Sequence, residues 1–253
     1  MRTIIKYGLA TVLAGFSLTS YAVPVLQVGA YAGVGDAGTY ADYQVSLVNP
    51  TESDTAVTTD STILFAGAYG PNTVSLGAAT NYGSIDPVLS VFEGHGAIVV
   101  ASVQDGMLAS ALASLTIGGN AAFYASATLN GLFPNNHDPL KDAVSDFLFF
   151  DIGAFTNTVL VPDFTTESLG SQLGEIKALS IGGVGNLDWI HFDLMALEVT
   201  ANGPNLRTTW EVNPGSHDVT WKKPVSVPEP SVLLLLGLGL LGLGFCCRKA
   251  SHS

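Results

Sequence analysis

The most polar loop of the chain carries residue types that could bind a hard cation. Asn136, Asp138 and Asp142 offer the side-chain oxygen atoms that Ca²⁺ prefers, and Asp146 and Asp151 follow nearby in the sequence. Their spacing does not match an EF-hand loop, and the same residues would also form an Asx-turn and a helix cap with solvated charges. The sequence favours the turn, with a calcium site at Asn136, Asp138 and Asp142 as the alternative.

A histidine and an aspartate two positions apart, His191 and Asp193, form the second candidate. In a strand they would point to one face, whereas Ile190, Phe192 and Leu194 would point to the other. Such a pair is either a general acid/base pair or an ion pair on the surface of an edge strand, and the sequence favours the surface pair. No serine or cysteine nucleophile has a sequence context that would join it, so we predict no catalytic residue and no enzyme activity.

The elements that must position these residues are predicted to be strands. Alternating or β-branched apolar patterns, separated by Gly, Pro, Asn and Asp, recur at roughly regular spacing. Gly118-Gly119-Asn120 indicates a hairpin, and 139–145 is the best candidate for a helix. The pattern is typical of an all-β fold, an antiparallel β-sandwich or jelly roll. The predicted strands are 25–31, 40–48, 62–68, 97–103, 107–117, 121–129, 175–181, 189–200, 206–212 and 218–221.

The charge of the chain is strongly negative. It has 253 residues and a net charge of −12, and the segment 23–225 contains 20 acidic and 5 basic residues, a net charge of −15 with histidine neutral. Such a surface repels nucleic acid, which excludes that class of partner, and could attract divalent cations or cationic polymers. The two cysteines, Cys246 and Cys247, lie outside this segment, so it contains no disulfide.

The N-terminus has the parts of a secretory signal peptide. Arg2 and Lys6 are positive, 7–18 is apolar, and small residues surround Ala22. We predict a Sec signal peptide at 1–22. It would direct the chain to the Sec translocon, and signal peptidase would cut it off after Ala22. An uncleaved membrane anchor is the alternative.

A second apolar segment, 231–247, lies near the C-terminus and contains no charge. As a helix it would extend about 25 Å, near the lower limit for crossing a bilayer core. Arg248 and Lys249 follow it and form a basic stop that would stay in the cytoplasm. We therefore predict a transmembrane helix that leaves 23–225 exported as one β domain, with a buried core helix as the alternative.

The tetrapeptide Val227-Pro228-Glu229-Pro230 directly precedes that apolar segment. A Pro-Glu-Pro tripeptide, a short apolar helix and a basic stop, in this order at a C-terminus, resemble the PEP-CTERM sorting signal of Gram-negative bacteria, and we assign this signal to 226–249. The resemblance implies recognition by an exosortase, a transient stay in the inner membrane, removal of the helix, and release or attachment at the outer surface. It also implies an association with exopolysaccharide production.

Five segments of the body carry a second resemblance: VPVLQVGAY (23–31), ILFAGAYGPN (63–72), FPNNHDP (133–139), WIHFD (189–193) and NPGSHDVT (213–220). They resemble the choice-of-anchor N proteins, a group in which one exported domain is attached to different sorting tails. No assigned activity or catalytic residue comes with this resemblance.

Together these features predict an exported, non-enzymatic surface or extracellular-matrix protein that is sorted by an exosortase and acts in the exopolysaccharide or biofilm layer. One alternative is a carbohydrate- or calcium-binding module, in which aromatic side chains stack on sugar rings. Another is a secreted glycan-acting enzyme, which would need two carboxylates facing one cleft. The aromatic residues in question, which would equally suit an ordinary core, are Tyr31, Tyr40, Tyr43, Tyr69, Tyr82, Trp189, Trp210 and Trp221.

Overall fold

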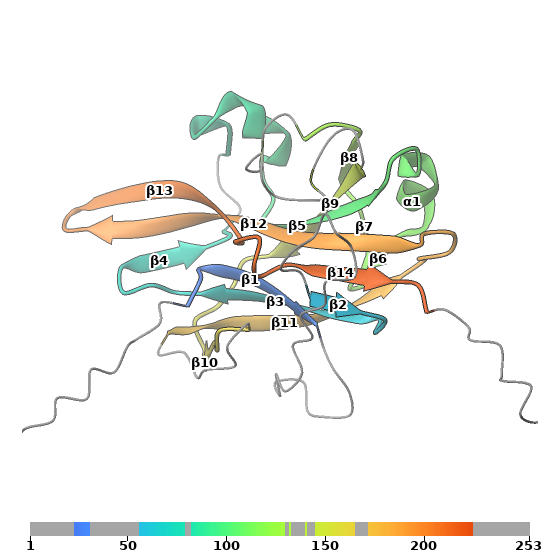
Figure 1. Ribbon diagram of the computed structural model, residues 1–253. Coiled ribbons are helices and arrows are strands. Elements are labelled where there is room, and N and C mark those ends of the chain that lie inside the picture. Colours follow the sequence, from blue (N-terminus) through green and yellow to red (C-terminus); the bar gives the residue numbers. More distant parts are fainter. Residues whose placement is uncertain are drawn as a thin grey trace, which may run out of the picture.

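The computed structural model describes residues 23–30, 56–78, 82–129, 132, 140, 145–164 and 172–224. Within these ranges the chain is mostly β-strand, with one short α-helix and two 3₁₀-helices (Figure 1). For the described residues of the exported body, the prediction of an all-β fold is therefore confirmed. No helix in this part of the chain is long and apolar enough to cross a membrane. The predicted signal peptide 1–22 and transmembrane helix 231–247 lie outside the described residues.

The smaller of the two described sheets has the order β1-β3-β11-β6-β7, with β10 added beside β11. All of its strand pairs are antiparallel. Its strands are β1 (Leu26–Ala30), β3 (Thr62–Ala68), β6 (Thr116–Ile117), β7 (Asn120–Ala121), β10 (Val159–Leu160) and β11 (Leu173–Gly182).

The larger sheet has the order β2-β14-β12-β5-β9-β8, with β13 and β4 also paired to β12. Its strands are β2 (Ala56–Thr58), β4 (Thr73–Leu76), β5 (Ala97–Gln104), β8 (Tyr124–Ser126), β9 (Ser145–Gly153), β12 (Trp189–Asn202), β13 (Asn205–Val212) and β14 (Val219–Lys222). The pair β14 and β2 is parallel, so this sheet is mixed and the prediction of a purely antiparallel fold is wrong at this edge. The two strands are far apart in the sequence, and no hairpin forces them to run in opposite directions.

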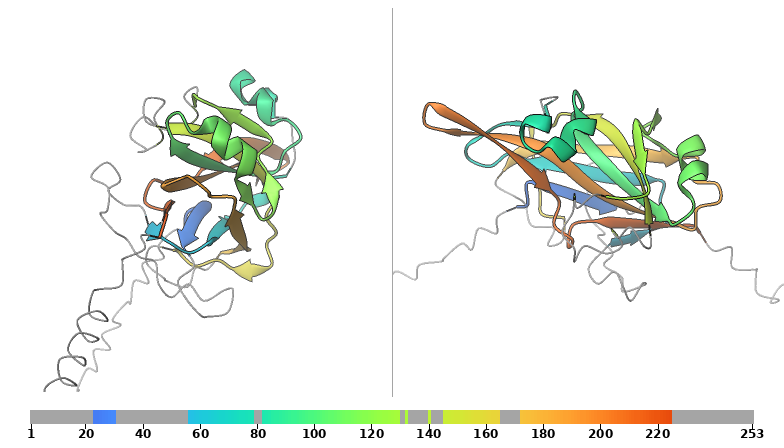
Figure 2. Two further views of the ribbon diagram at one scale, coloured as in Figure 1. Left: turned by 90° about the vertical axis from the view of Figure 1, so that its right-hand side faces the viewer. Right: turned by 90° about the horizontal axis from the view of Figure 1, so that it is seen from above.

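The main apolar core lies between the two sheets, which are seen as two layers in Figure 2. Phe65 of β3 meets Phe192 of β12 across this core, edge to face, with 6.2 Å between the ring centroids. A second core covers the opposite face of the larger sheet. It includes Tyr82 of the helix η1 (Tyr82–Ser84) and Phe92 of the helix η2 (Pro87–Phe92). The central strands of the larger sheet are therefore buried on both faces.

Two local predictions have opposite outcomes. The hairpin at Gly118-Gly119-Asn120 is confirmed, because β6 and β7 pair around Gly118 and Gly119, whose φ angles of 57° and 81° suit a primed turn. The predicted strand 107–117 is instead the helix α1 (Leu108–Ser114) followed by β6. Leu, Ala and Ser fill α1 without a β-branched residue, and the Asp146 carboxylate accepts the backbone N–H of Leu108 at its first turn.

The strand β9 was missed by the sequence patterns, which predicted a helix at 139–145. Ser145 begins β9, and of the remaining residues of that segment only Leu140 is described. The run 147–150 of β9 is apolar at every position because its two faces contribute to the two cores, so it shows no strand alternation.

Candidate functional site

The strongest cluster of side chains that could act as acids, bases or metal ligands is centred on β12, in the middle of the larger sheet. His191 and Asp193 do point to the same face of β12, as predicted, but both are fully buried. The prediction of a surface pair on an edge strand is therefore wrong. β12 pairs with β14 on one side and β5 on the other, and Met195, the next residue on this face, belongs to the second core. The alternation of polar and apolar residues in this part of β12 is also typical of a strand with one face in solvent. The sequence does not show that a second core covers that face.

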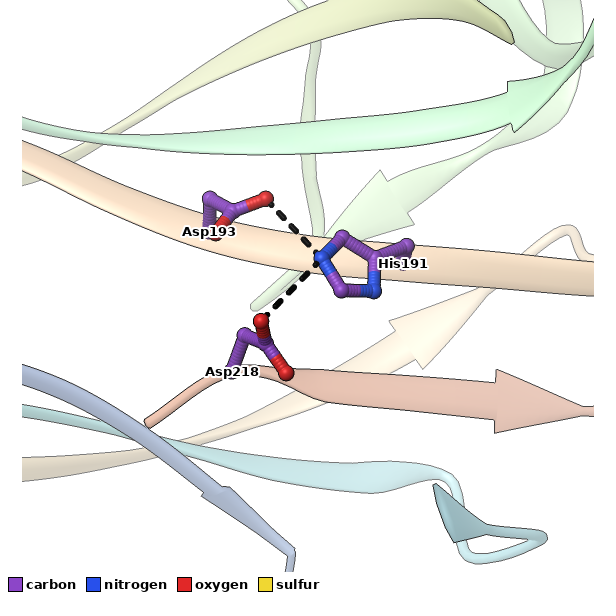
Figure 3. A group of neighbouring side chains, drawn as sticks. All are labelled: His191, Asp193 and Asp218. Carbon is purple, nitrogen blue, oxygen red and sulfur yellow. Dashed lines mark ion pairs between the residues drawn. The ribbon is translucent and has the colours of Figure 1, made fainter. Parts of the chain in front are cut away.

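A second carboxylate joins this pair from the neighbouring strand. The register aligns His191 with Thr220 of β14, and Asp218 directly precedes that strand. The His191 Nε2 atom lies 3.2 Å from Asp193 Oδ2 and 3.7 Å from Asp218 Oδ2, with all three side chains buried (Figure 3). One imidazole nitrogen thus faces two carboxylates.

The outer atoms of the cluster are held by hydrogen bonds. His191 Nδ1 lies 2.9 Å from the Thr220 hydroxyl oxygen, and the Asn213 side-chain amide donates to Asp193 Oδ1 at 3.0 Å. Asn213 Oδ1 in turn accepts the backbone N–H of Leu194 at 2.7 Å. These contacts fix the orientation of the imidazole ring and of the Asp193 carboxylate.

A second buried histidine–aspartate pair lies beside the cluster. His217 Nε2 is 3.2 Å from Asp163 Oδ1, and its Nδ1 is 2.9 Å from the Ser216 hydroxyl oxygen. Burial lowers the pKa of His217 below its ordinary value, and the hydrogen bond to Asp163 acts in the opposite direction. The His217 carbonyl accepts the backbone N–H of Val28 at 2.9 Å, which ties the segment before β14 to the smaller sheet.

A third pair, His95 and Asp151, is partly exposed. His95 Nδ1 lies 3.0 Å from Asp151 Oδ2, and the two side chains are 29% and 34% exposed. The His95 ring stacks on Phe123, with 3.6 Å between the ring centroids. Asp151 Oδ1 accepts the backbone N–H groups of Gly96 and Gly153, so this carboxylate already holds a turn in place.

The predicted calcium residues Asn136, Asp138 and Asp142 lie outside the described residues. The two aspartates that follow them in the sequence, Asp146 and Asp151, are described by the structure and lie in different places. Asp146 holds the first turn of α1, and Asp151 holds the turn that carries His95. These two carboxylates therefore have structural roles in different places.

Comparison with protein families identifies the C-terminal segment. Residues 226–249 match the PEP-CTERM protein-sorting motif. This bears out the sequence assignment of the segment, and it implies processing by an exosortase and an exported protein that passes through the membrane to the cell surface. No curated protein and no solved structure matches the chain. The resemblance of the body to the choice-of-anchor N proteins gains no support from these comparisons.

Sequence patterns alone did not identify Asp218, Thr220 and Asn213 as partners of His191 and Asp193. Asp188, which lies closer in the sequence, instead accepts a hydrogen bond from the Gln104 side chain at 3.2 Å. Strand pairing, and not sequence distance, assembles the cluster. The signal that could have found it is the run His217-Asp218 at the start of a strand expected to pair with β12.

Proposed function

We propose that the protein is an exported, non-enzymatic surface or extracellular-matrix protein that an exosortase sorts and that acts in the exopolysaccharide or biofilm layer. The observation that carries this proposal is the PEP-CTERM match at residues 226–249, at the end of an all-β body. The match supports the delivery route, and the chemistry of the body supports a role without catalysis.

The first support for a non-enzymatic role is the burial of the candidate acid/base groups. His191, Asp193 and Asp218 are enclosed between strands and cores, where a polymeric substrate does not reach them. A general acid or base must lie within hydrogen-bond reach of the proton that it transfers. The partly exposed His95 is stacked on Phe123, and its partner Asp151 is engaged by two backbone N–H groups.

The aromatic residues give the second support. Tyr82 is fully buried and Trp221 is 4% exposed, so both belong to the cores. Tyr69 is half-buried, and its hydroxyl donates to the Phe155 carbonyl at 2.6 Å. These three rings contribute to folding and leave no broad aromatic platform of their own for stacking on sugars.

The negative charge of the body supports a place in a hydrated matrix. Segment 23–225 carries a net charge of −15, which keeps the domain soluble and repels other polyanions. Such a surface also concentrates divalent cations, which bridge acidic chains in a polysaccharide layer.

The delivery route is tested by changing the tripeptide. Replacing Pro228, Glu229 and Pro230 together with Ala should leave the full-length C-terminus in the inner membrane of the native host. Membrane fractionation and intact mass would detect the unprocessed form. Pro224→Ala, just outside the matched segment, is the control and should mature normally. Normal maturation of the triple variant would refute the sorting assignment.

The place of action is tested separately. The mature protein should co-purify with extracellular polysaccharide and should be released when that polymer is enzymatically degraded. A mature protein that stays on the cell after complete removal of the polysaccharide would refute a matrix role, while leaving the sorting assignment intact.

A further inference from the structure

We infer that His191, Asp193 and Asp218 form a buried site for a divalent transition-metal ion of the zinc type. The three side chains come from β12 and from the residue before β14, and they point toward one another (Figure 3). One nitrogen and two oxygens, each a possible ligand atom, lie within 4.8 Å of one another. None of these three residues belongs to the sorting tail or to the predicted calcium loop at 136–142.

The spacing of the donor atoms fits a compact coordination sphere. Zinc is held about 2.0–2.2 Å from nitrogen and carboxylate oxygen, which places neighbouring donors of a tetrahedral site about 3.3 Å apart. The distances from His191 Nε2 to the two carboxylate oxygens are 3.2 and 3.7 Å. Small side-chain movements would bring all three donors to bonding distance.

Charge favours a cation over a simple ion pair. His191 Nε2 carries at most one proton, which can be donated to only one of the two carboxylates. Asp218 Oδ2, at 3.7 Å, lies beyond hydrogen-bond distance from Nε2. A divalent cation, unlike a single proton, would interact with both carboxylates at once.

The surrounding contacts are those that orient metal ligands. A ligating histidine commonly donates its second ring N–H to an oxygen, and a ligating carboxylate is itself hydrogen-bonded. Here the Thr220 hydroxyl contacts His191 Nδ1 at 2.9 Å, and the Asn213 amide donates to the outer oxygen of Asp193 at 3.0 Å. Both contacts leave His191 Nε2 and Asp193 Oδ2 facing each other, 3.2 Å apart.

An independent observation comes from β5 on the other side of β12. Ser102 pairs in register with His191, so its side chain lies on the same face of the sheet. Its hydroxyl is fully buried and makes no hydrogen bond within the described part of the chain. A buried hydroxyl without a partner is costly, and a metal-bound water beside His191 would supply that partner.

The ligand types select the class of ion. Ca²⁺ takes six to eight oxygen donors, whereas an imidazole nitrogen suits zinc and its neighbours in the first transition row. A set of one imidazole and two carboxylates is therefore a poor calcium site. Because the site is buried, we expect the metal to enter during folding and to leave slowly afterwards.

The test uses the untagged full-length protein in detergent, unfolded with guanidinium and a chelator and refolded with or without Zn²⁺. After dialysis, the zinc-refolded protein should hold close to one zinc per chain by elemental analysis and should unfold at a higher temperature. The zinc X-ray absorption spectrum should show only nitrogen and oxygen donors at about 2.0–2.2 Å. Failure to retain zinc, or sulfur donors near about 2.3 Å from the cysteine pair, would overturn the proposal.

Substitutions test which residues bind the zinc ion. Asp218→Asn should abolish zinc retention, and Thr220→Val, which keeps the shape of the side chain, should weaken zinc binding roughly 10–100-fold. Two controls should retain zinc: the combined Asn136→Ala, Asp138→Ala and Asp142→Ala variant, and His95→Ala. Loss of zinc from the loop variant with retention in Asp218→Asn would move the site to the loop and overturn the proposal. If Asp218→Asn does not fold, the donor set measured on the unmodified protein still supports or overturns the site.

Discussion

The larger sheet carries two histidine–aspartate pairs of nearly the same length in very different surroundings. His191 and Asp193 on β12 are 3.2 Å apart and fully buried. His95 and Asp151, before β5 and on β9, are 3.0 Å apart and about one-third exposed. The same two types of side chain are therefore placed once in the interior and once at the surface of the described structure.

From this difference we expect the surroundings, more than the pair itself, to set the contribution of each pair to stability. At the exposed pair, water competes for both groups, and such pairs contribute about 0–1 kcal/mol to stability. At the buried pair the groups have given up water, a second carboxylate is present, and Asn213 and Thr220 complete the contacts. Removing one partner there leaves the rest of the network buried with a missing acceptor or donor.

Removing the buried carboxylate should have the largest effect. Asp193→Ala takes an acceptor away from both His191 and Asn213, and we expect a loss of about 3–5 kcal/mol in the free energy of unfolding. Chemical denaturation, followed by circular dichroism, measures this loss. A change below about 1 kcal/mol would mean that the buried pair behaves like an exposed one.

Removing the amide that supports Asp193 should have a smaller effect. Asn213→Ala deletes the donor to Asp193 Oδ1 and the acceptor for the Leu194 N–H, both buried. We expect a loss of about 2–3 kcal/mol, since buried polar groups are left without those contacts. The same denaturation experiment applies, and equal stability of Asn213→Ala and the unmodified protein would show that the amide is dispensable.

The corresponding substitution at the exposed pair should reduce the free energy of unfolding by a smaller amount. Asp151→Ala removes the acceptor for His95 and for two backbone N–H groups, but water can replace the carboxylate at this surface. We expect a loss of about 1–2 kcal/mol in the free energy of unfolding. A loss as large as that of Asp193→Ala would remove the distinction between the two sites.

The smallest expected effect concerns how the stability of the protein depends on pH near the exposed pair. Tyr82 lies beside the exposed pair, and its hydroxyl donates to the Gly96 carbonyl at 2.6 Å. Burial, with a smaller contribution from the Asp151 charge, raises the pKa of Tyr82 above its ordinary value. The folded state therefore keeps this proton after the unfolded state has lost it, so stability falls as the pH rises above about 10.

Tyr82→Phe isolates this effect. At neutral pH the variant should lose about 1 kcal/mol from the missing hydrogen bond. Because phenylalanine does not titrate, its deficit relative to the unmodified protein should shrink above about pH 10. Unfolding midpoints of both proteins across this range provide the measurement, and a constant deficit would contradict the raised pKa.

Much of the strand pattern could be predicted from sequence because it is local. β3 matches the prediction 62–68, and the hairpin at Gly118 and Gly119 follows from two residues that tolerate positive φ. α1 was mistaken for a strand because its short apolar run carries no clear period. The parallel pairing of β2 with β14 depends on strands far apart in the sequence, which no local pattern reveals.

The candidate functional residues likewise include some that could be predicted from sequence and some that could not. The sorting signal could be assigned from sequence because it is linear, with its parts in fixed order within 226–249. The cluster of His191, Asp193 and Asp218 could not, because Asp218 reaches His191 only through the pairing of β14 with β12. Its burial depends on the second core, which is assembled from helices and strands throughout the body.

We propose that this acidic β-rich body is exported and delivered by its sorting tail. Intact mass and fractionation of the protein from its native host, with and without the exosortase, test it most directly. We expect a form outside the inner membrane that lacks 1–22 and 231–247, and its replacement by a form with the full C-terminus in the inner membrane when the exosortase is absent. The full C-terminus in the inner membrane of both strains would contradict the claim.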